Sequence, residues 1–187
     1  MRRLAPVFAA LLLSACAVPA IDAYQPTIAN AQAVRGADLP AMRVGEFTLA
    51  PGQPASLDRS VVIRASTLRP PKGDSFSKYL GDCLAAELRA AGKLDPAANV
   101  VITGALTESR VSSGVSIGEA SLGATFTVTR DGRQVYQKTL RVEQVWQSNF
   151  MGAIAIPDAM NQYTALYGKL VGALLSDEAF RAAIKRT

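Results

Sequence analysis

The sequence contains no histidine, only two cysteines and a single tryptophan among its 187 residues. Histidine is the usual general base near neutral pH and a common ligand of zinc and copper. A catalytic site or a zinc or copper site in this chain would have to form without it. Carboxylates are spread singly, and the one adjacent pair, Asp177-Glu178, more simply favours the start of a helix. We therefore expect no catalytic residue, no metal ion and no cofactor.

One short motif points the other way. Gly114-Val115-Ser116-Ile117-Gly118 matches G-x-S-x-G, the pattern of a nucleophile elbow. That chemistry needs a base beside the serine and a strand-to-helix turn that presents it. The chain has no histidine, and its hydrophobic alternation places the motif between two strands. An enzyme would need a histidine-free mechanism, and this is the least favoured alternative.

The charge is mildly positive and evenly scattered. The 20 basic and 15 acidic residues give a formal net charge of +5 at pH 7, and the basic side chains form no cluster along the chain. Because a nucleic-acid-binding face needs such a cluster, nucleic acid is not an expected partner. The length fits one domain with a sizeable core and is short for two.

The first twenty residues have the layout of an export signal. Arg2-Arg3 precede an apolar run, Leu4–Leu13, and the small residues Ser14-Ala15 follow it. The run is well short of the roughly 20 residues needed to cross a bilayer. We therefore expect an export signal that is removed from the mature protein, rather than a membrane-spanning helix.

Leu13-Ser14-Ala15-Cys16 resembles the lipobox of bacterial lipoproteins, in which an apolar residue and two small residues precede an invariant cysteine. The resemblance implies that residues 1–15 are a signal peptide, that the Cys16 thiol receives a diacylglyceryl group, and that the new amino terminus receives a further acyl chain such as palmitate. Two or three chains anchor a protein stably, since each buried methylene contributes about 0.8 kcal/mol. Inner-membrane lipoproteins tend to carry aspartate where this chain has Ala17, so the resemblance points to the outer membrane, with the domain facing the periplasm.

Composition divides the rest of the chain in two. Residues 16–41 consist of the lipidated Cys16 and a stretch that is poor in large apolar residues, which we predict to be a tether. The part around Tyr24 to Ile28 could instead lie against the domain. Residues 42–187 carry regular hydrophobic periodicity and are predicted to form a single periplasmic domain. Cys83 has no cysteine partner once Cys16 is acylated, and we expect it to be a buried apolar residue of a helix.

The periodicity predicts an α+β fold of order ββ-α-βββ-α. Period-two alternation indicates five strands, at Met42–Leu49, Ser60–Ser66, Val100–Ser109, Val115–Thr129 and Arg133–Gln147. We expect an antiparallel sheet of four to five strands with the two main helices packed on one face, and a hairpin or loop between the first two strands.

Helices are predicted in three places. Apolar residues in steps of three and four indicate a first helix that is capped by Asp74 or Ser75 and stops at Gly92. A second runs from Pro157 to Leu175, because proline is favoured in a first turn. Ser176 is the expected cap of a short last helix.

The turn between the last two strands sets their register. A two-residue Asp131-Gly132 turn would place apolar opposite polar side chains, whereas a three-residue loop, residues 130–132, pairs Phe126 with Tyr136. We therefore predict the three-residue loop, with its glycine in a left-handed conformation. A bulge is also predicted near Gly118, because the apolar alternation changes parity there.

The segment Trp146–Ile156 is the feature least explained by a core. It contains the only tryptophan and mixes large apolar residues with glycine between the last long strand and the last long helix. Two interpretations stay open: a crossover packed under the helix, or an apolar lip for a partner or lipid, with Phe150, Met151 and Ile154 as binding residues. Trp146 itself is expected to be buried.

Together these observations favour a noncatalytic function. We expect an envelope lipoprotein that is held at the membrane by acyl chains on Cys16 and whose domain binds another envelope protein, as an accessory part of an assembly or transport complex. The alternative is a lipid- or glycan-binding carrier or sensor, which would need a pocket between the sheet and the helices.

Overall fold

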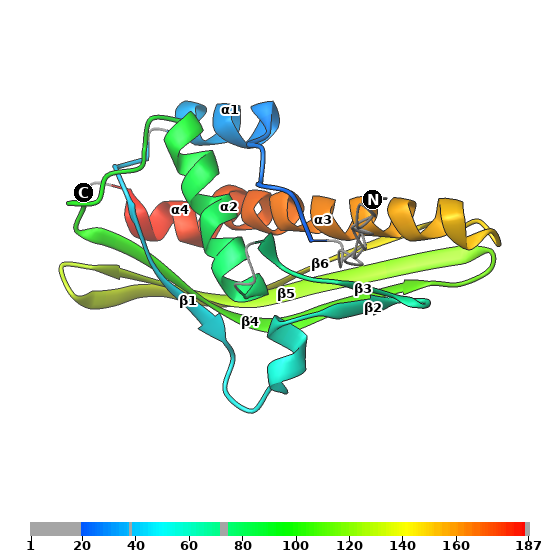
Figure 1. Cartoon of the computed structure of the whole chain (residues 1–187). Helices are drawn as coiled ribbons and strands as arrows, with labels where there is room; N and C mark the ends of the chain where they lie inside the picture. The colour runs from blue at the N-terminus through cyan, green and yellow to red at the C-terminus, as the bar shows by residue number, and fades with distance from the viewer. Residues whose placement is uncertain (1–19, 38, 72–74, 186–187) are drawn as a thin grey trace, which may run out of the picture.

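The computed structural model describes residues 20–37, 39–71 and 75–185, and its fold is α+β, as predicted. A four-stranded sheet of order β1-β4-β5-β6 forms one layer, and the helices cover one of its faces (Figure 1). A separate hairpin, β2-β3, lies beside the sheet. The long strands give the molecule two distinct ends, one at the β5–β6 turn and the other at the β4–β5 turn (Figure 1).

The sheet is mixed rather than purely antiparallel. Its strands are β1 (Arg43–Leu49), β4 (Val100–Ser113), β5 (Ile117–Arg130) and β6 (Arg133–Gln147). Strands β4, β5 and β6 are joined by short turns and run antiparallel, but β1 runs parallel to β4. The parallel pair arises because a long crossover that contains α2 separates these two strands in the sequence.

The strand predicted at Ser60–Ser66 is a hairpin of its own. After the short 3-10 helix η1 (Ala55–Asp58), strand β2 (Val61–Ile63) turns back at once into β3 (Ser66–Leu68). The two strands pair with each other and not with β1, so the first two predicted strands are joined by a loop, one of the two expected connections, and not by a hairpin. The cause is Arg64, whose left-handed backbone (φ 54°) closes a two-residue turn in the middle of the predicted strand.

Helix α2 (Phe76–Ala90) begins and ends as predicted. The Ser75 hydroxyl accepts a hydrogen bond from the Lys78 amide (3.2 Å), and Gly92 adopts a left-handed conformation (φ 71°) just beyond the helix. Cys83 is fully buried in the middle of the apolar face, which confirms its predicted position. Burial raises the pKa of its thiol far above the ordinary value, so the side chain behaves as an apolar residue.

The last two helices start at different residues from those predicted. Helix α3 (Gly152–Ser176) begins five residues before Pro157, which therefore lies inside the helix. Ser176 is the last residue of α3, so Asp177 takes the cap of α4 (Glu178–Ile184), where its carboxylate accepts a hydrogen bond from the Phe180 amide (2.9 Å). An N-cap needs an extended backbone, which Asp177 has (ψ 123°).

The β5–β6 hairpin corrects the predicted register. Asp131 (φ 51°) and Gly132 (φ 77°) form a two-residue turn, so the predicted left-handed glycine is confirmed and the three-residue loop is wrong. A bulge then leaves Val135 unpaired in β6, and Phe126 pairs with Lys138. The bulge returns the apolar side chains to the helix-covered face, which is the result that the longer loop was expected to give.

The other predicted bulge, near Gly118, is absent. Strand β5 pairs with both neighbours without a register shift there, and the irregularity between β4 and β5 lies instead between Leu106 and Glu108. Ile117 is simply an exposed residue on the sheet face that the helices leave open, and Val115 belongs to the turn before β5.

Most of the predicted tether is part of the folded domain. Helix α1 (Ile28–Gly36) packs against α2 and α3, and Ile21, Val34 and Leu39 are buried in the core. Ala20 forms a parallel bridge with Arg69, just after β3. The folded unit therefore includes Ala20 and does not start at residue 42, because a few well-placed apolar residues suffice to dock this segment.

A buried carboxylate of α2 fixes the docked segment in place. The Oε1 atom of Glu87, which is fully buried, accepts hydrogen bonds from the Tyr24 hydroxyl (2.6 Å), the Thr27 amide (3.0 Å) and the Asn30 side-chain amide (3.0 Å). The Asn30 amide also donates to the carbonyl oxygen of Gly168 in α3 (3.0 Å). These bonds connect the segment to both long helices.

Candidate functional site

The predicted binding residues lie together at one end of the molecule. Phe150 is 76% exposed, and Met151 and Ile154 are 50% and 52% exposed, so the apolar lip describes them better than the buried crossover. They belong to the loop between β6 and α3 and to the first turn of α3. Large apolar side chains at this degree of exposure are available for binding.

Strands β4, β5 and β6 bring further exposed apolar residues to the same end. Val115, in the β4–β5 turn, is 75% exposed, and Ile117 and Val145 are 61% and 64% exposed. We call the six residues the apolar tip: Val115, Ile117, Val145, Phe150, Met151 and Ile154. They account for six of the nine large apolar side chains that are exposed in the described part of the chain.

The two segments that form the apolar tip carry no charge. Residues 112–118 and 145–156 contain no aspartate, glutamate, lysine or arginine, although such residues make up 19% of the chain. Ordinary protein surface is rich in these residues, and their absence is typical of a surface that becomes buried against an apolar partner.

Hydrogen bonds join the two segments into one unit. The Ser148 amide donates to the carbonyl oxygen of Ser116 (2.9 Å), and the hydroxyl groups of Ser113 and Ser148 lie 3.0 Å apart. The Asn149 side chain accepts a hydrogen bond from the Met151 amide (2.8 Å) at the start of α3. The exposed side chains therefore project from a backbone that is fixed on both sides.

Arg64 connects the β2–β3 hairpin to this unit. Its guanidinium group donates to four backbone carbonyl oxygens: Ser113 (2.9 Å), Gly114 (2.7 Å), Asn149 (2.6 Å) and Phe150 (2.9 Å). A planar guanidinium with several fixed donors suits such a cluster of acceptors. Arg64 also has a left-handed backbone (φ 54°), which is costly for a residue other than glycine and is held here by its side-chain bonds.

Trp146 lies directly behind the apolar tip. Its indole ring is partly buried against the core and covers Gly118, where a Cβ atom would approach the ring to 2.3 Å. The indole Nε1 is shielded from solvent and has no hydrogen-bond partner among the described residues. The prediction that Trp146 is buried is therefore confirmed in part, and Gly118 is explained by this close approach.

Sequence reasoning missed half of the apolar tip and the residue that organises it. Val115, Ile117 and Val145 looked like ordinary strand positions, although the charge-free run around the first two was a usable signal. Nothing in the sequence distinguishes Arg64 from the other basic residues, because its role depends on a hairpin that periodicity did not reveal. The G-x-S-x-G motif lies in the β4–β5 turn, between two strands, and not in a strand-to-helix turn.

A groove separates the docked N-terminal segment from α3. It has a volume of ≈ 760 Å³ and is mainly apolar, with Ile21, Tyr24, Tyr79, Pro157 and Met160 among its lining residues. It is the feature closest to the predicted pocket between sheet and helices, but the segment around Tyr24 forms one wall, and the sheet forms none.

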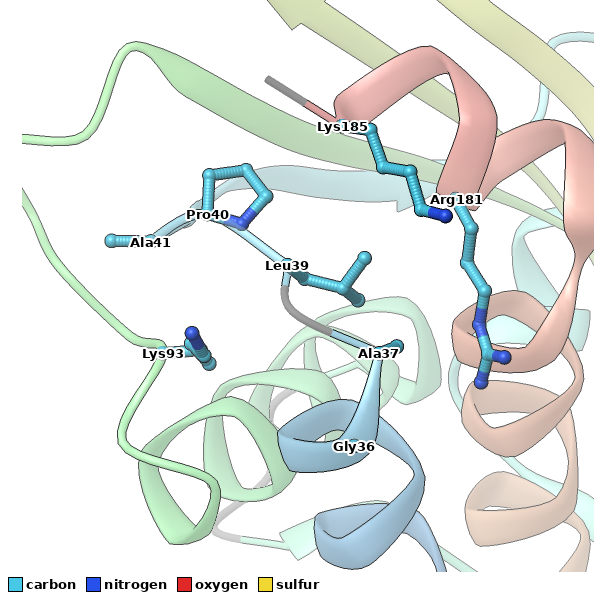
Figure 2. A pocket seen from close by; sticks show the side chains of 8 residues that line it. All are labelled: Gly36, Ala37, Leu39, Pro40, Ala41, Lys93, Arg181 and Lys185. Atoms are coloured by element: carbon cyan, nitrogen blue, oxygen red, sulfur yellow. The ribbon is translucent and has the colours of Figure 1, made fainter. Parts of the chain in front are cut away.

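A second cavity, of ≈ 720 Å³, lies beside the ends of α1, α2 and α4 (Figure 2), and these lie toward the end of the molecule opposite the β4–β5 turn (Figure 1). Lys93, which follows α2, faces Arg181 and Lys185 across it, and the chain after α1 forms its floor (Figure 2). We call it the basic cavity. Its three cationic side chains make this end chemically unlike the apolar tip.

Two kinds of site are not found in the described residues. No group of three or more histidine, cysteine, aspartate or glutamate side chains is placed to hold a metal ion there. None of the helices in the same residues is both long and apolar enough to cross a membrane. Cys16, the predicted lipidation site, lies outside the described residues.

Comparisons with known proteins show the fold alone. No family model and no curated protein matches the chain. The structure is similar to that of a Xanthomonas campestris protein of the DUF330 family, with a TM-score of 0.55 and 14% identity over 85% of this chain and 95% of that one.

Similarities with TM-scores below 0.5 include proteins described as lipoproteins. A candidate lipoprotein from Caulobacter crescentus gives a TM-score of 0.42 and 13% identity over 56% of this chain and 84% of its own. A minor lipoprotein from Acinetobacter baumannii gives a TM-score of 0.35 and 12% identity over 78% of this chain and 93% of its own.

Proposed function

We propose that this protein is a membrane-anchored envelope lipoprotein whose domain is a noncatalytic interaction module, an accessory part of an assembly or transport complex. The observation that carries the proposal is the apolar tip. Its six exposed apolar side chains project from two hydrogen-bonded segments that contain no charged residue. Exposed apolar side chains contribute little to the stability of the isolated domain, and a binding role accounts for them. Cys16 supplies the anchor, and the outer membrane is the proposed location because Ala17 follows it.

The protein partner is proposed to dock along β6. This strand is the last of the sheet and has 15 residues, whereas strands usually have about five or six. No strand in the described part of the chain pairs with its outer edge. A long open edge offers a row of backbone donors and acceptors to a partner strand, and β6 leads directly into the apolar tip.

Photocrosslinking in intact envelopes tests this proposal. A photoreactive residue at Gln137, exposed on β6, should give a discrete crosslinked protein, and the same residue at Gln53, exposed in the loop before η1, should not. Mass spectrometry of the purified mature protein should show acyl groups on Cys16. An unmodified Cys16 would overturn the anchor, and equal crosslinking from both positions would overturn the β6 interface.

The groove favours a second candidate function, a carrier or sensor for a lipid or glycan. Its ≈ 760 Å³ would hold an acyl chain or a small glycan, and its walls combine aromatic and aliphatic side chains. Native mass spectrometry of the gently purified protein should then show a copurified small molecule. Met160→Trp, which fills the groove, should remove that molecule, whereas Val135→Ser, an exposed residue of β6 that does not line the groove, should retain it.

A further inference from the structure

We infer that the apolar tip inserts into the surface of the same membrane that holds the acyl chains on Cys16, so that the domain meets the bilayer at two points. The inference rests on the proposed lipid anchor and gives the apolar tip a definite occupant, a lipid surface. It leaves the edge of β6 free for the protein partner.

The position of Ala20 and the few residues that separate it from Cys16 support a lipid occupant. Ala20 forms a parallel bridge with Arg69, just after β3, and the other end of β3 adjoins the β2–β3 turn, where Arg64 contacts the apolar tip. Cys16 stands four positions before Ala20, which limits the distance between them to about 14 Å. A lipid attached to Cys16 therefore keeps a membrane surface close to Ala20.

The distance from Ala20 to the apolar tip is of the same order. The five steps along the chain from Arg69 through β3 back to Arg64 in the turn span at most about 17 Å. Since both distances are short, the anchor on Cys16 and the apolar tip can reach the same membrane surface. The longer tether of the sequence prediction would not have imposed this restriction.

The chemistry of the apolar tip suits the interfacial region of a bilayer. Ionised side chains resist transfer from water, and the two segments of the tip contain none, although Glu119 pairs opposite Val145 and marks the boundary of the apolar tip on the open face of the sheet. Backbone carbonyl groups resist it as well unless they are hydrogen-bonded. Arg64 already donates to four of them from the β2–β3 turn, so these acceptors keep hydrogen-bond partners when the exposed side chains are buried in the interfacial region.

Fluorescence of the lipidated protein in vesicles of phosphatidylethanolamine and phosphatidylglycerol tests the inference. The variant Phe150→Cys, labelled with an environment-sensitive dye, reports on the apolar tip, and Val135→Cys, exposed at the other end of the sheet, is the matched control. Cys83 is fully buried and stays unlabelled. Spin-labelled lipids should quench the dye at position 150 at least twofold more than the dye at position 135. Val115→Cys, in the other segment of the tip, should behave like Phe150→Cys.

The possible failures are distinguishable. Protein that carries no acyl chains and does not bind vesicles would refute the proposed anchor. Lipidated, vesicle-bound protein with equal quenching at positions 150 and 135 would overturn the membrane contact while leaving the anchor intact. If the dye at position 150 is exposed in pure lipid vesicles and is shielded only after an envelope extract is added, the apolar tip binds a protein and the lipid assignment is wrong.

Discussion

The two ends of the sheet each use an arginine that donates to backbone carbonyl oxygens, yet they present opposite surfaces. At the apolar tip, Arg64 holds four carbonyl groups beneath uncharged side chains. At the far end, Arg130 donates to the carbonyl oxygens of Ile184 and Lys185, where α4 ends beside the basic cavity. Arginine hydrogen bonds to backbone carbonyl groups thus occur beneath an apolar surface at one end and beside a cationic surface at the other.

The difference shows that a surface takes its character from its side chains, once its backbone groups are satisfied. A loop whose carbonyl groups needed water could not be buried against an apolar partner at low cost. Arg64 removes that need at the apolar tip. The end with the basic cavity keeps charged side chains, as expected for a surface that stays in water.

Removing the two arginines should expose the difference most clearly. Arg64→Ala leaves four acceptors without their charged donor, and we expect the free energy of unfolding to fall by about 2–3 kcal/mol. Arg130→Ala loses two bonds and should cost about 1 kcal/mol. Urea denaturation measures both, and Arg64→Lys, which keeps the charge but loses the planar fork, should lie between wild type and Arg64→Ala. Equal losses for the two alanine variants would contradict the larger role given to Arg64.

Two glycines sharpen the comparison at a smaller scale. Gly118→Ala places a methyl group against the Trp146 ring, and we expect a loss of about 2 kcal/mol together with a red shift of the tryptophan emission. Gly132→Ala, at the other end, strains a left-handed backbone but meets no neighbouring atom, so about 1 kcal/mol is expected, with no spectral change. Thermal unfolding with fluorescence detection records both quantities, and an unchanged spectrum in Gly118→Ala would show that the ring does not pack as described.

Much of the fold could be predicted because its elements carry their own local signals. The stripe of α2, the Ser75 cap and the alternation of β5 all led to the correct element. The register of β5 with β6 could not be predicted, because it depends on a bulge at Val135 that restores the apolar face by a route the turn alone does not show. The parallel pairing of β1 with β4 could not be predicted either, because the two strands are distant in the sequence and no local pattern gives their relative direction.

Sequence reasoning could propose only the part of the candidate site that lies in one continuous segment of the chain. The exposure of Phe150, Met151 and Ile154 agrees with the apolar lip, one of the two interpretations left open for this apolar segment, and their binding role stays a prediction. Arg64 lies 49 residues or more from each carbonyl group that it binds, and no local pattern reports such a contact. The alternative that the chain around Tyr24 to Ile28 lies against the domain is confirmed, but the extent of this docking was not predicted, because the partner Glu87 lies in a distant helix.

Substitutions of the exposed side chains should barely change stability at either end. We expect Phe150→Ser and Val135→Ser to change the free energy of unfolding by no more than about 0.5 kcal/mol each, because both side chains are exposed. Urea denaturation measures this directly. A loss of 2 kcal/mol or more in Phe150→Ser alone would mean that this residue belongs to the core and that the apolar tip is smaller than described.

The smallest effect concerns the open face between the two ends. The Arg141 guanidinium, which donates to the Glu108 carboxylate (2.7 Å), lowers the pKa of that carboxyl group. The native state thus binds the proton less readily than the unfolded state, so the stabilisation is present above the ordinary glutamate pKa and is lost as the pH falls through the lowered value. Glu108→Gln should therefore reduce the acid sensitivity of unfolding between pH 5 and pH 3 slightly, as urea denaturation across that range would record. Glu46→Gln, exposed on β1, serves as the control, and an unchanged pH profile in Glu108→Gln would contradict the pairing.

The docked N-terminal segment also determines the order in which the domain can be assembled. The bond from Asn30 to Gly168 spans 138 positions in the sequence, so α1 has no native site until α3 has been delivered and has packed. Contacts of such long range slow folding, because the intervening chain must close first. During that interval the surfaces of α2 and α3 that α1 later covers remain open. The earliest part of the domain to be synthesised is consequently among the last to reach its native place, and a chaperone that shields those two helices would act in this window.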